Sequence, residues 1–195
     1  MLDLPTPDLP ESRALPTGWK RNAAFAAEVG IAIIVSFWID IINWPRLGGW
    51  IRVVAVGTYV AAQLPFRGRS FLANCLRAAL MSIFAGVVVL ALLPIYRAGT
   101  LHIIFISGFT FLAFTVAIRV IFGHSGRTDL LRKRLPFFII AGVLIFLAAI
   151  SRYVADLAPK ARIVHLVAAA VCWIIAAVIW TIRVLPKVTR VQAEP

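Results

Sequence analysis

Long apolar segments alternate with short polar connections along the whole chain. Six apolar windows lie at about 23–43, 47–64, 75–95, 101–122, 136–154 and 164–184. Most of them reach the roughly 20 residues that an α-helix needs to cross the hydrocarbon core of a bilayer. The pattern predicts an all-α fold, a polytopic membrane helix bundle of about six transmembrane helices embedded in lipid.

The window at 47–64 is the weakest of the six, because it is short and contains Arg52 and Gln63. A half-buried helix is the alternative to a complete span at this place. Four prolines and no hydrophobic core precede the first window, unlike the apolar centre of a secretory signal. We therefore expect a flexible Pro-rich tail over 1–22, a six-span bundle over 23–186 and a short tail over 187–195.

The charge of the chain fits a membrane protein better than a nucleic-acid-binding one. Of its 195 residues 62% are apolar and 14% are charged, and the net charge is +12. The basic residues lie between apolar windows, and no solvated basic face with interleaved aromatic residues is found. Six spans would place at one end of the bundle Arg13, Lys20, Arg21, Arg67, Arg69, Arg77, Arg127, Arg132, Lys133, Arg134, Arg183, Lys187 and Arg190.

The opposite end would hold a smaller set of basic residues, Arg46, Arg52, Arg97, Arg152, Lys160 and Arg162. Cytoplasmic connections of membrane proteins carry an excess of Lys and Arg. The sequence therefore predicts a cytoplasmic C-terminus and, with six spans, a cytoplasmic N-terminus.

Three histidines are the candidates for metal or cofactor binding. His102 and His165 each lie about one turn into an outward-to-inward span, so their imidazoles share a depth near the outer surface. Two histidines at one depth on different helices are what a bis-imidazole haem b requires, and Arg97 and Arg162 would then meet its propionates. The alternative is that both are interfacial histidines bonded to backbone or water. His124 ends the fourth span, about 33 Å from His102 along a helix, so the two cannot share one metal ion.

Charged residues inside the windows need partners, because an isolated charge in the membrane is costly. Arg119 lies near the inner end of the fourth window and Glu28 near the start of the first, which suggests an ion pair between them. The alternative is that Arg119 extends to the inner headgroups. Asp40 is expected to meet Arg46 or Arg52 at the outer end of the bundle.

The fourth window ends in Gly123-His124-Ser125-Gly126-Arg127. Gly123 can end a helix and Ser125-Gly126 allows a tight turn, so turn formation alone would explain these residues.

The stretch from Leu101-His102 through Arg119 to this G-H-S-G-R segment resembles the hallmark of the NnrS family, in which a leucine-histidine, an arginine and a G-H-T-G-R signature follow one another. The resemblance covers roughly residues 25–190 and corresponds to the C-terminal half of longer members. Two departures occur inside it: Ala117-Ile118 stand before the arginine where the family has methionine-threonine, and Ser125 replaces the threonine.

The resemblance implies a haem-containing protein of the bacterial inner membrane, with copper as a further candidate metal. It implies a place in nitric oxide metabolism, denitrification and protection from nitrosative stress, without any established catalytic reaction. His102 and His124 would be the metal ligands, and Arg119, Gly123, His124, Gly126 and Arg127 the signature. The half that is not matched carries further histidines, so a second copy or a partner subunit would complete the bundle.

The leading hypothesis is therefore a haem b protein that acts in nitric oxide response or respiratory electron transfer. Two alternatives remain: a cofactor-free subunit that stabilises a larger respiratory complex, and a small-solute transporter with Arg119 and Glu28 along its path.

Overall fold

The computed structural model describes residues 18–63, 70–126 and 128–189, and within these ranges it contains helices and turns but no strand. The long helices are α1 (Trp19–Ile41), α2 (Pro45–Gln63), α3 (Phe71–Leu92), α5 (Phe111–His124), α7 (Pro136–Leu157) and α8 (Arg162–Val184). The shorter segments are η1 (Pro94–Tyr96), α4 (Arg97–His102), η2 (Ile103–Thr110), α6 (Thr128–Arg132), η3 (Pro159–Ala161) and α9 (Pro186–Thr189). The predicted all-α fold is confirmed.

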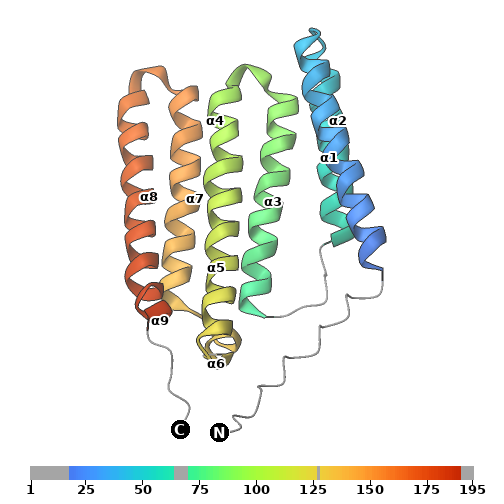
Figure 1. The fold of residues 1–195 in the computed structure, drawn as a ribbon. Helices are drawn as coiled ribbons and strands as arrows, with labels where there is room; N and C mark the ends of the chain where they lie inside the picture. The colour runs from blue at the N-terminus through green and yellow to red at the C-terminus, as the bar shows by residue number, and fades with distance from the viewer. Residues whose placement is uncertain (1–17, 64–69, 127, 190–195) are drawn as a thin grey trace, which may run out of the picture.

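The helices run up and down as a row of antiparallel neighbours (Figure 1). Segments α4, η2 and α5 form one continuous rod, which packs between α3 and α7. The α1–α2 pair lies beyond α3, and α8 packs along α7. The start of α1 and the end of α8 lie at the same end of the bundle, called the inner end below; η1 and η3 lie at the opposite, outer end.

Five helical segments of the described chain are long and apolar enough to cross a membrane: Trp19–Ile41, Phe71–Leu92, Pro94–His124, Pro136–Leu157 and Pro159–Val188. Helix α2 is not among them, in line with the weakness of its apolar window. Large apolar side chains are exposed along α1, α7 and α8, as lipid contact requires. The chain is therefore a multi-pass membrane protein.

The low hydropathy of α2 has a structural reason. Its buried positions include Gly48, Gly49 and Arg52, and the helix packs between α1 and α3. A Cβ added at Gly49 would lie 3.2 Å from Cα of Ala91 in α3. The small and charged residues that weaken the apolar window are thus the ones that face protein.

Helix α3 packs against η2 through small residues on both sides. A Cβ added at Gly86 would lie 2.5 Å from Cγ1 of Ile104, and one added at Gly108 would collide with Ile83. The hydroxyls of Ser82 and Ser107 share a buried hydrogen bond of 2.5 Å. Small residues let membrane helices approach closely, and this contact holds the rod against α3.

The close contact between Gly86 and Ile104 leads us to predict that a larger residue at position 86 destabilises the protein. We expect Gly86→Ala to lower the free energy of unfolding by about 1–3 kcal/mol, as overpacking of a tight interface does. Gly30→Ala is the control, because nothing lies within 4 Å of a Cβ at that position of α1. Ile104→Ala removes the colliding Cγ1, so it should cost less in the Gly86→Ala background than in the unmodified chain. Equal unfolding midpoints in detergent for the two single variants would contradict the prediction.

Candidate functional site

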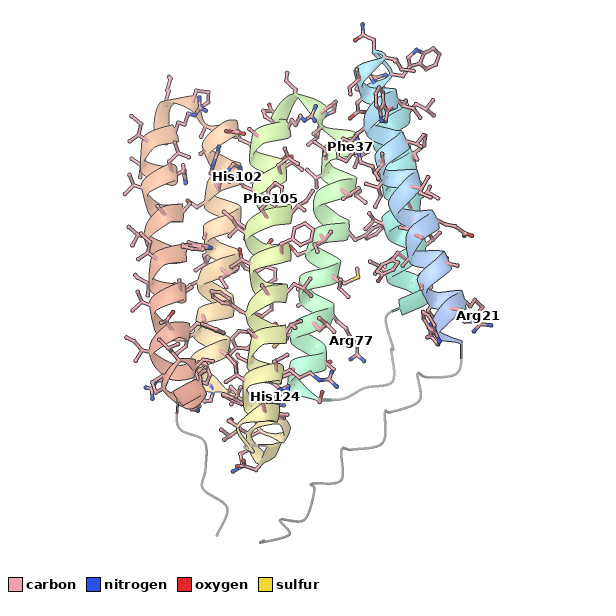
Figure 2. All side chains as sticks on the ribbon, in the orientation of Figure 1. Arg21, Phe37, Arg77, His102, Phe105 and His124 are labelled. Atoms are coloured by element: carbon pink, nitrogen blue, oxygen red, sulfur yellow. The ribbon has the colours of Figure 1, made fainter. Side chains whose placement is uncertain are left out.

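The histidines predicted as ligands lie at the two ends of the rod and on α8. His102 is the last residue of α4, near the outer end, and His124 is the last residue of α5, at the inner end (Figure 2). His165 lies in the first turn of α8, beside α7. His102 and His165 thus share the outer end, as predicted, whereas His102 and His124 are separated by the length of the rod.

The hydrogen bonds of the three histidines fix which ring nitrogen carries the proton. Nδ1 of His102 lies 2.7 Å from the carbonyl oxygen of Ala98, and Nδ1 of His124 lies 2.9 Å from that of Val120. Since a carbonyl oxygen only accepts, both Nδ1 atoms must donate. The neutral side chains therefore have an unprotonated Nε2, the nitrogen that binds haem iron or a metal ion in this tautomer.

His165 reaches the same tautomer by a different route. The hydroxyl of Ser151 in α7 donates its one hydrogen to the backbone oxygen of His165 at 3.0 Å. The same hydroxyl lies 3.3 Å from Nδ1 of His165, so it can only accept there. Nδ1 of His165 is consequently the donor, and its Nε2 is available to a ligand.

A groove of about 430 Å³ separates η2 from α8, and its lining residues are Ile106, Arg152, Leu166, Ala169, Ala170, Trp173 and Ile174. Ile106 follows His102 by four residues and Ala169 follows His165 by four, so each histidine stands about one turn above the groove on a helix that lines it. The volume is in the range of sites that hold small molecules and cofactors. Sequence reasoning missed this groove, because the small residues of α8 indicated only helix packing.

A second cavity, of about 480 Å³, lies at the outer end between η1 and the α7–α8 turn. Arg97 and Arg162 both line it, and both are exposed. Arg97 and Arg162 are the two arginines that the sequence analysis predicted as partners of the haem propionates. The fold places both of them at this recess.

An ion pair connects the recess to the groove. Arg152 lines the groove and donates to Asp156 at 3.0 Å, and Asp156 lines the recess. The carboxylate of Asp156 also accepts the backbone N–H of Gly99 at 2.5 Å, which ties α7 to α4. Asp156 thus places one carboxylate in the recess that Arg97 and Arg162 line, and Arg152 is its ion-pair partner. The i,i+4 spacing of Arg152 and Asp156 was a readable signal for this pair.

The predicted Arg119–Glu28 ion pair is not formed. Both side chains are exposed, and α2 and α3 lie between the helices that carry them. Equal depth in the membrane was the basis for the pairing, but depth does not specify which helices are neighbours. A transport path along these two residues therefore has no support in the geometry.

The predicted partner of Asp40 is confirmed as Arg52. Nη2 of Arg52 donates to Oδ2 of Asp40 at 2.7 Å, and the two side chains are 8% and 12% exposed. The guanidinium also lies over the ring of Phe37, 4.5 Å from its centroid. This pair joins the outer ends of α1 and α2.

The signature segment ends the rod in a slightly different way from the prediction. Gly123 lies inside α5 and the helix continues to His124. Gly126 has a φ of 70°, which is the left-handed conformation that favours glycine after a helix end. Gly126 rather than Gly123 thus supplies the turn, and Arg127 lies outside the described residues.

Groups of three or more His, Cys, Asp or Glu side chains that could hold a metal ion do not occur in the part of the chain that the structure describes. The two described cysteines, Cys75 in α3 and Cys172 in α8, are unbonded.

One family model matches the chain, and it is described as NnrS protein. The match covers residues 6–192, so it extends further toward both ends than the resemblance found in the sequence. No curated protein and no solved structure matches the chain.

Proposed function

The chain belongs to the NnrS family, and from this premise we propose that it is a haem b-binding membrane protein that acts in nitric oxide response or in associated respiratory electron transfer. The observation that carries the proposal is the outer-end arrangement of groove, histidines and arginines. An apolar groove lies beside two imidazoles with available Nε2 atoms and next to a recess with two exposed arginines.

The residues of the outer end fit the chemistry of haem. His102 would be the axial ligand and His165 its partner, since iron binds the Nε2 lone pair while Nδ1–H is held by a carbonyl or hydroxyl oxygen. The groove residues offer apolar contact to a macrocycle, and Arg97 and Arg162 offer charge-assisted hydrogen bonds to propionates.

When bound, haem would supply one-electron chemistry, and with both imidazoles as ligands a small diatomic molecule would bind only in place of one of them. The chain's own contribution is to hold the two imidazoles by Ala98 and Ser151 in the ligating tautomer. It also keeps the site largely apolar, with Arg152 neutralised by Asp156. Copper is not part of the proposal, because His102 and His124 lie at opposite ends of the rod.

The experiment that tests the proposal is a dithionite-reduced-minus-oxidised visible spectrum of the purified protein, combined with a pyridine haemochrome assay. A sharp b-type α band is the expected result, and nitric oxide titration of the reduced protein then separates a role in nitric oxide response from electron transfer alone. A colourless but folded preparation from haem-replete cells would overturn the proposal.

We place the inner end of the bundle in the cytoplasm of a bacterial cell. Basic residues gather there from separate segments of the described chain, Lys20, Arg21, Arg77, Lys133, Arg134, Arg183 and Lys187. The positive-inside rule then predicts a cytoplasmic C-terminus. Alkaline phosphatase fused to the C-terminus should be inactive in a bacterial host, and an active fusion would reverse the orientation.

A further inference from the structure

Helix α1 is the span that the rest of the described chain covers least. Only 6% of its apolar window is buried, against 28–33% for the spans of α3, the rod and α7. The helix packs along α2 with one face, and Ser36 is its single buried residue. Most of its surface is therefore open to lipid or to another protein.

One exposed line of α1 has the spacing of a coiled-coil seam. Its residues follow one another at intervals of four, three, four and three positions: Ala24, Glu28, Ile31, Val35 and Trp38. This is the heptad pattern with which one helix packs lengthwise on another. All five residues are exposed, so no other helix of the described chain occupies this line, which is called the α1 seam below.

Glu28 is the charged residue of the α1 seam, and it lies inside the apolar window. It follows Trp19 by nine residues, which is about 13 Å along the helix. The basic residues Lys20 and Arg21 lie about 10 Å or more nearer the helix start. Glu28 makes no hydrogen bond or ion pair with the part of the chain that the structure describes. Ionisable side chains within membrane spans usually face protein, so this carboxyl group needs a partner from outside the chain.

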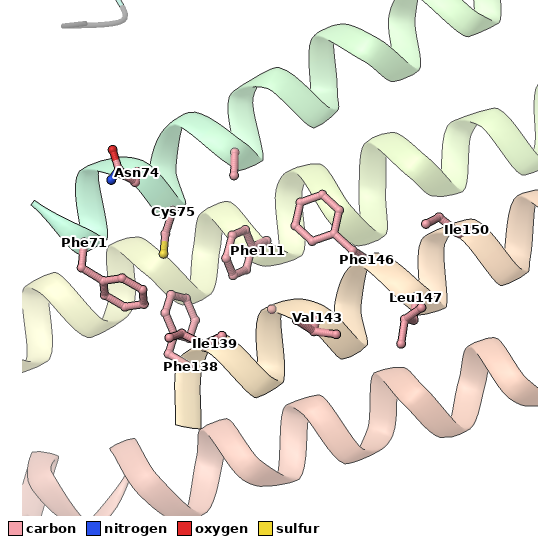
Figure 3. A pocket seen from close by; sticks show the side chains of 12 residues that line it. Phe71, Asn74, Cys75, Phe111, Phe138, Ile139, Val143, Phe146, Leu147 and Ile150 are labelled. Atoms are coloured by element: carbon pink, nitrogen blue, oxygen red, sulfur yellow. The ribbon is translucent and has the colours of Figure 1, made fainter. Parts of the chain in front are cut away.

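Apolar exposure alone would not identify that partner, because lipid tails are as apolar as leucine. The groove of about 430 Å³ between α3 and α7 is an example (Figure 3). The rings of Phe71, Phe111, Phe138 and Phe146 line it, and lipid acyl chains can fill it. The α1 seam differs from this groove because an acyl chain offers Glu28 no hydrogen bond.

We propose that the α1 seam packs against the α1 seam of a second copy of this chain, in a parallel pair of helices with Glu28 opposite Glu28 of the partner subunit. Two copies inserted in the same direction meet about a two-fold axis, which places each seam residue opposite its own equivalent. A carboxyl group suits that position, because its protonated form both donates and accepts a hydrogen bond. Ala24, one turn nearer the inner end, lets the two helices approach closely, and a single polar residue in a seam fixes its register.

The test measures association of the full chain in lipid vesicles, by Förster transfer between copies that carry donor or acceptor fluorophores at the C-terminus. The unmodified chain should be dimeric at high protein density and dissociate as lipid is added. Glu28→Leu should raise the dissociation constant about three- to thirtyfold, the range of a hydrogen bond between membrane helices. Glu28→Gln should keep the unmodified value, since an amide also donates and accepts.

Oxidative cross-linking then locates the interface. In a chain with Cys75→Ala and Cys172→Ala, Ala24→Cys should form a disulfide between copies, because seam residues face their own equivalents. Ala26→Cys is the matched control, since Ala26 is also exposed but lies on the opposite side of α1. Equal cross-linking of these two variants would overturn the proposal, as would equal association of Glu28→Leu and the unmodified chain. An unmodified chain that stays monomeric at every protein density, a result that needs no variant to fold, would overturn it as well.

Discussion

Replacing His102 with alanine is expected to lower the haem b content per polypeptide by at least about tenfold, since loss of even a group that orients a ligand typically costs 10- to 100-fold in affinity. The imidazole of His102 is held by the carbonyl of Ala98 with Nε2 available, beside a groove that can take a macrocycle. The measurement is a pyridine haemochrome assay of the purified variant, normalised to protein. Added imidazole should restore part of the b-type α band.

His124→Ala is the matched control for His102→Ala. Its imidazole makes the same bond to the carbonyl four residues earlier, but at the inner end of the rod. The control should keep the full haem content and the unfolding midpoint of the unmodified chain, whereas His102→Ala should unfold earlier, because bound haem stabilises the folded state. His165→Ala should also lower the haem content, because it too removes one of the two axial ligands, and the haem that it retains should have a changed spin state. Equal haem loss in His102→Ala and His124→Ala would contradict the assignment of the outer end.

The largest effect on stability is expected from separating the buried pair of α1 and α2. Arg52→Met leaves the carboxylate of Asp40 without its partner, at a side chain only 12% exposed. Removing one partner of a buried ion pair typically costs about 3–5 kcal/mol, because the remaining charge stays desolvated. The free energy of unfolding, followed by denaturant titration in detergent, should fall by this amount.

Two further variants separate the charge effect from loss of side-chain packing. Arg52→Met combined with Asp40→Leu should recover most of the loss, since an apolar pair of similar volume removes the unpaired charge. Lys133→Met is the control, because its pair with Asp129 spans 3.6 Å and both side chains are more than 60% exposed. Such surface pairs contribute little. A double variant no more stable than Arg52→Met would show that the loss arises from packing instead.

The depth of the candidate site residues in the membrane could be predicted from the sequence, but which helices pack against each other could not. Depth along each apolar window placed His102 and His165 together, and it placed Arg97 and Arg162 at the same end. The same reasoning failed for Glu28 and Arg119, because two residues at equal depth lie on helices that do not pack together. The prediction of the Asp40–Arg52 ion pair was correct, because these two residues lie on consecutive helices that are joined by a short turn and are therefore neighbours.

The amino-acid sequence by itself determined the helical class, the approximate position of each helix and the depth of each polar residue. In a membrane every backbone group must bond within its own helix, so length and hydropathy suffice for these features. The tertiary structure decided the order and rotation of the helices, and with them the tautomer of His165, the joining of Arg97 and Arg162 in one recess, and both grooves. Those features depend on contacts between distant segments, such as the contact of Gly86 with Ile104. The hydrophobic pattern within a single segment does not specify such contacts.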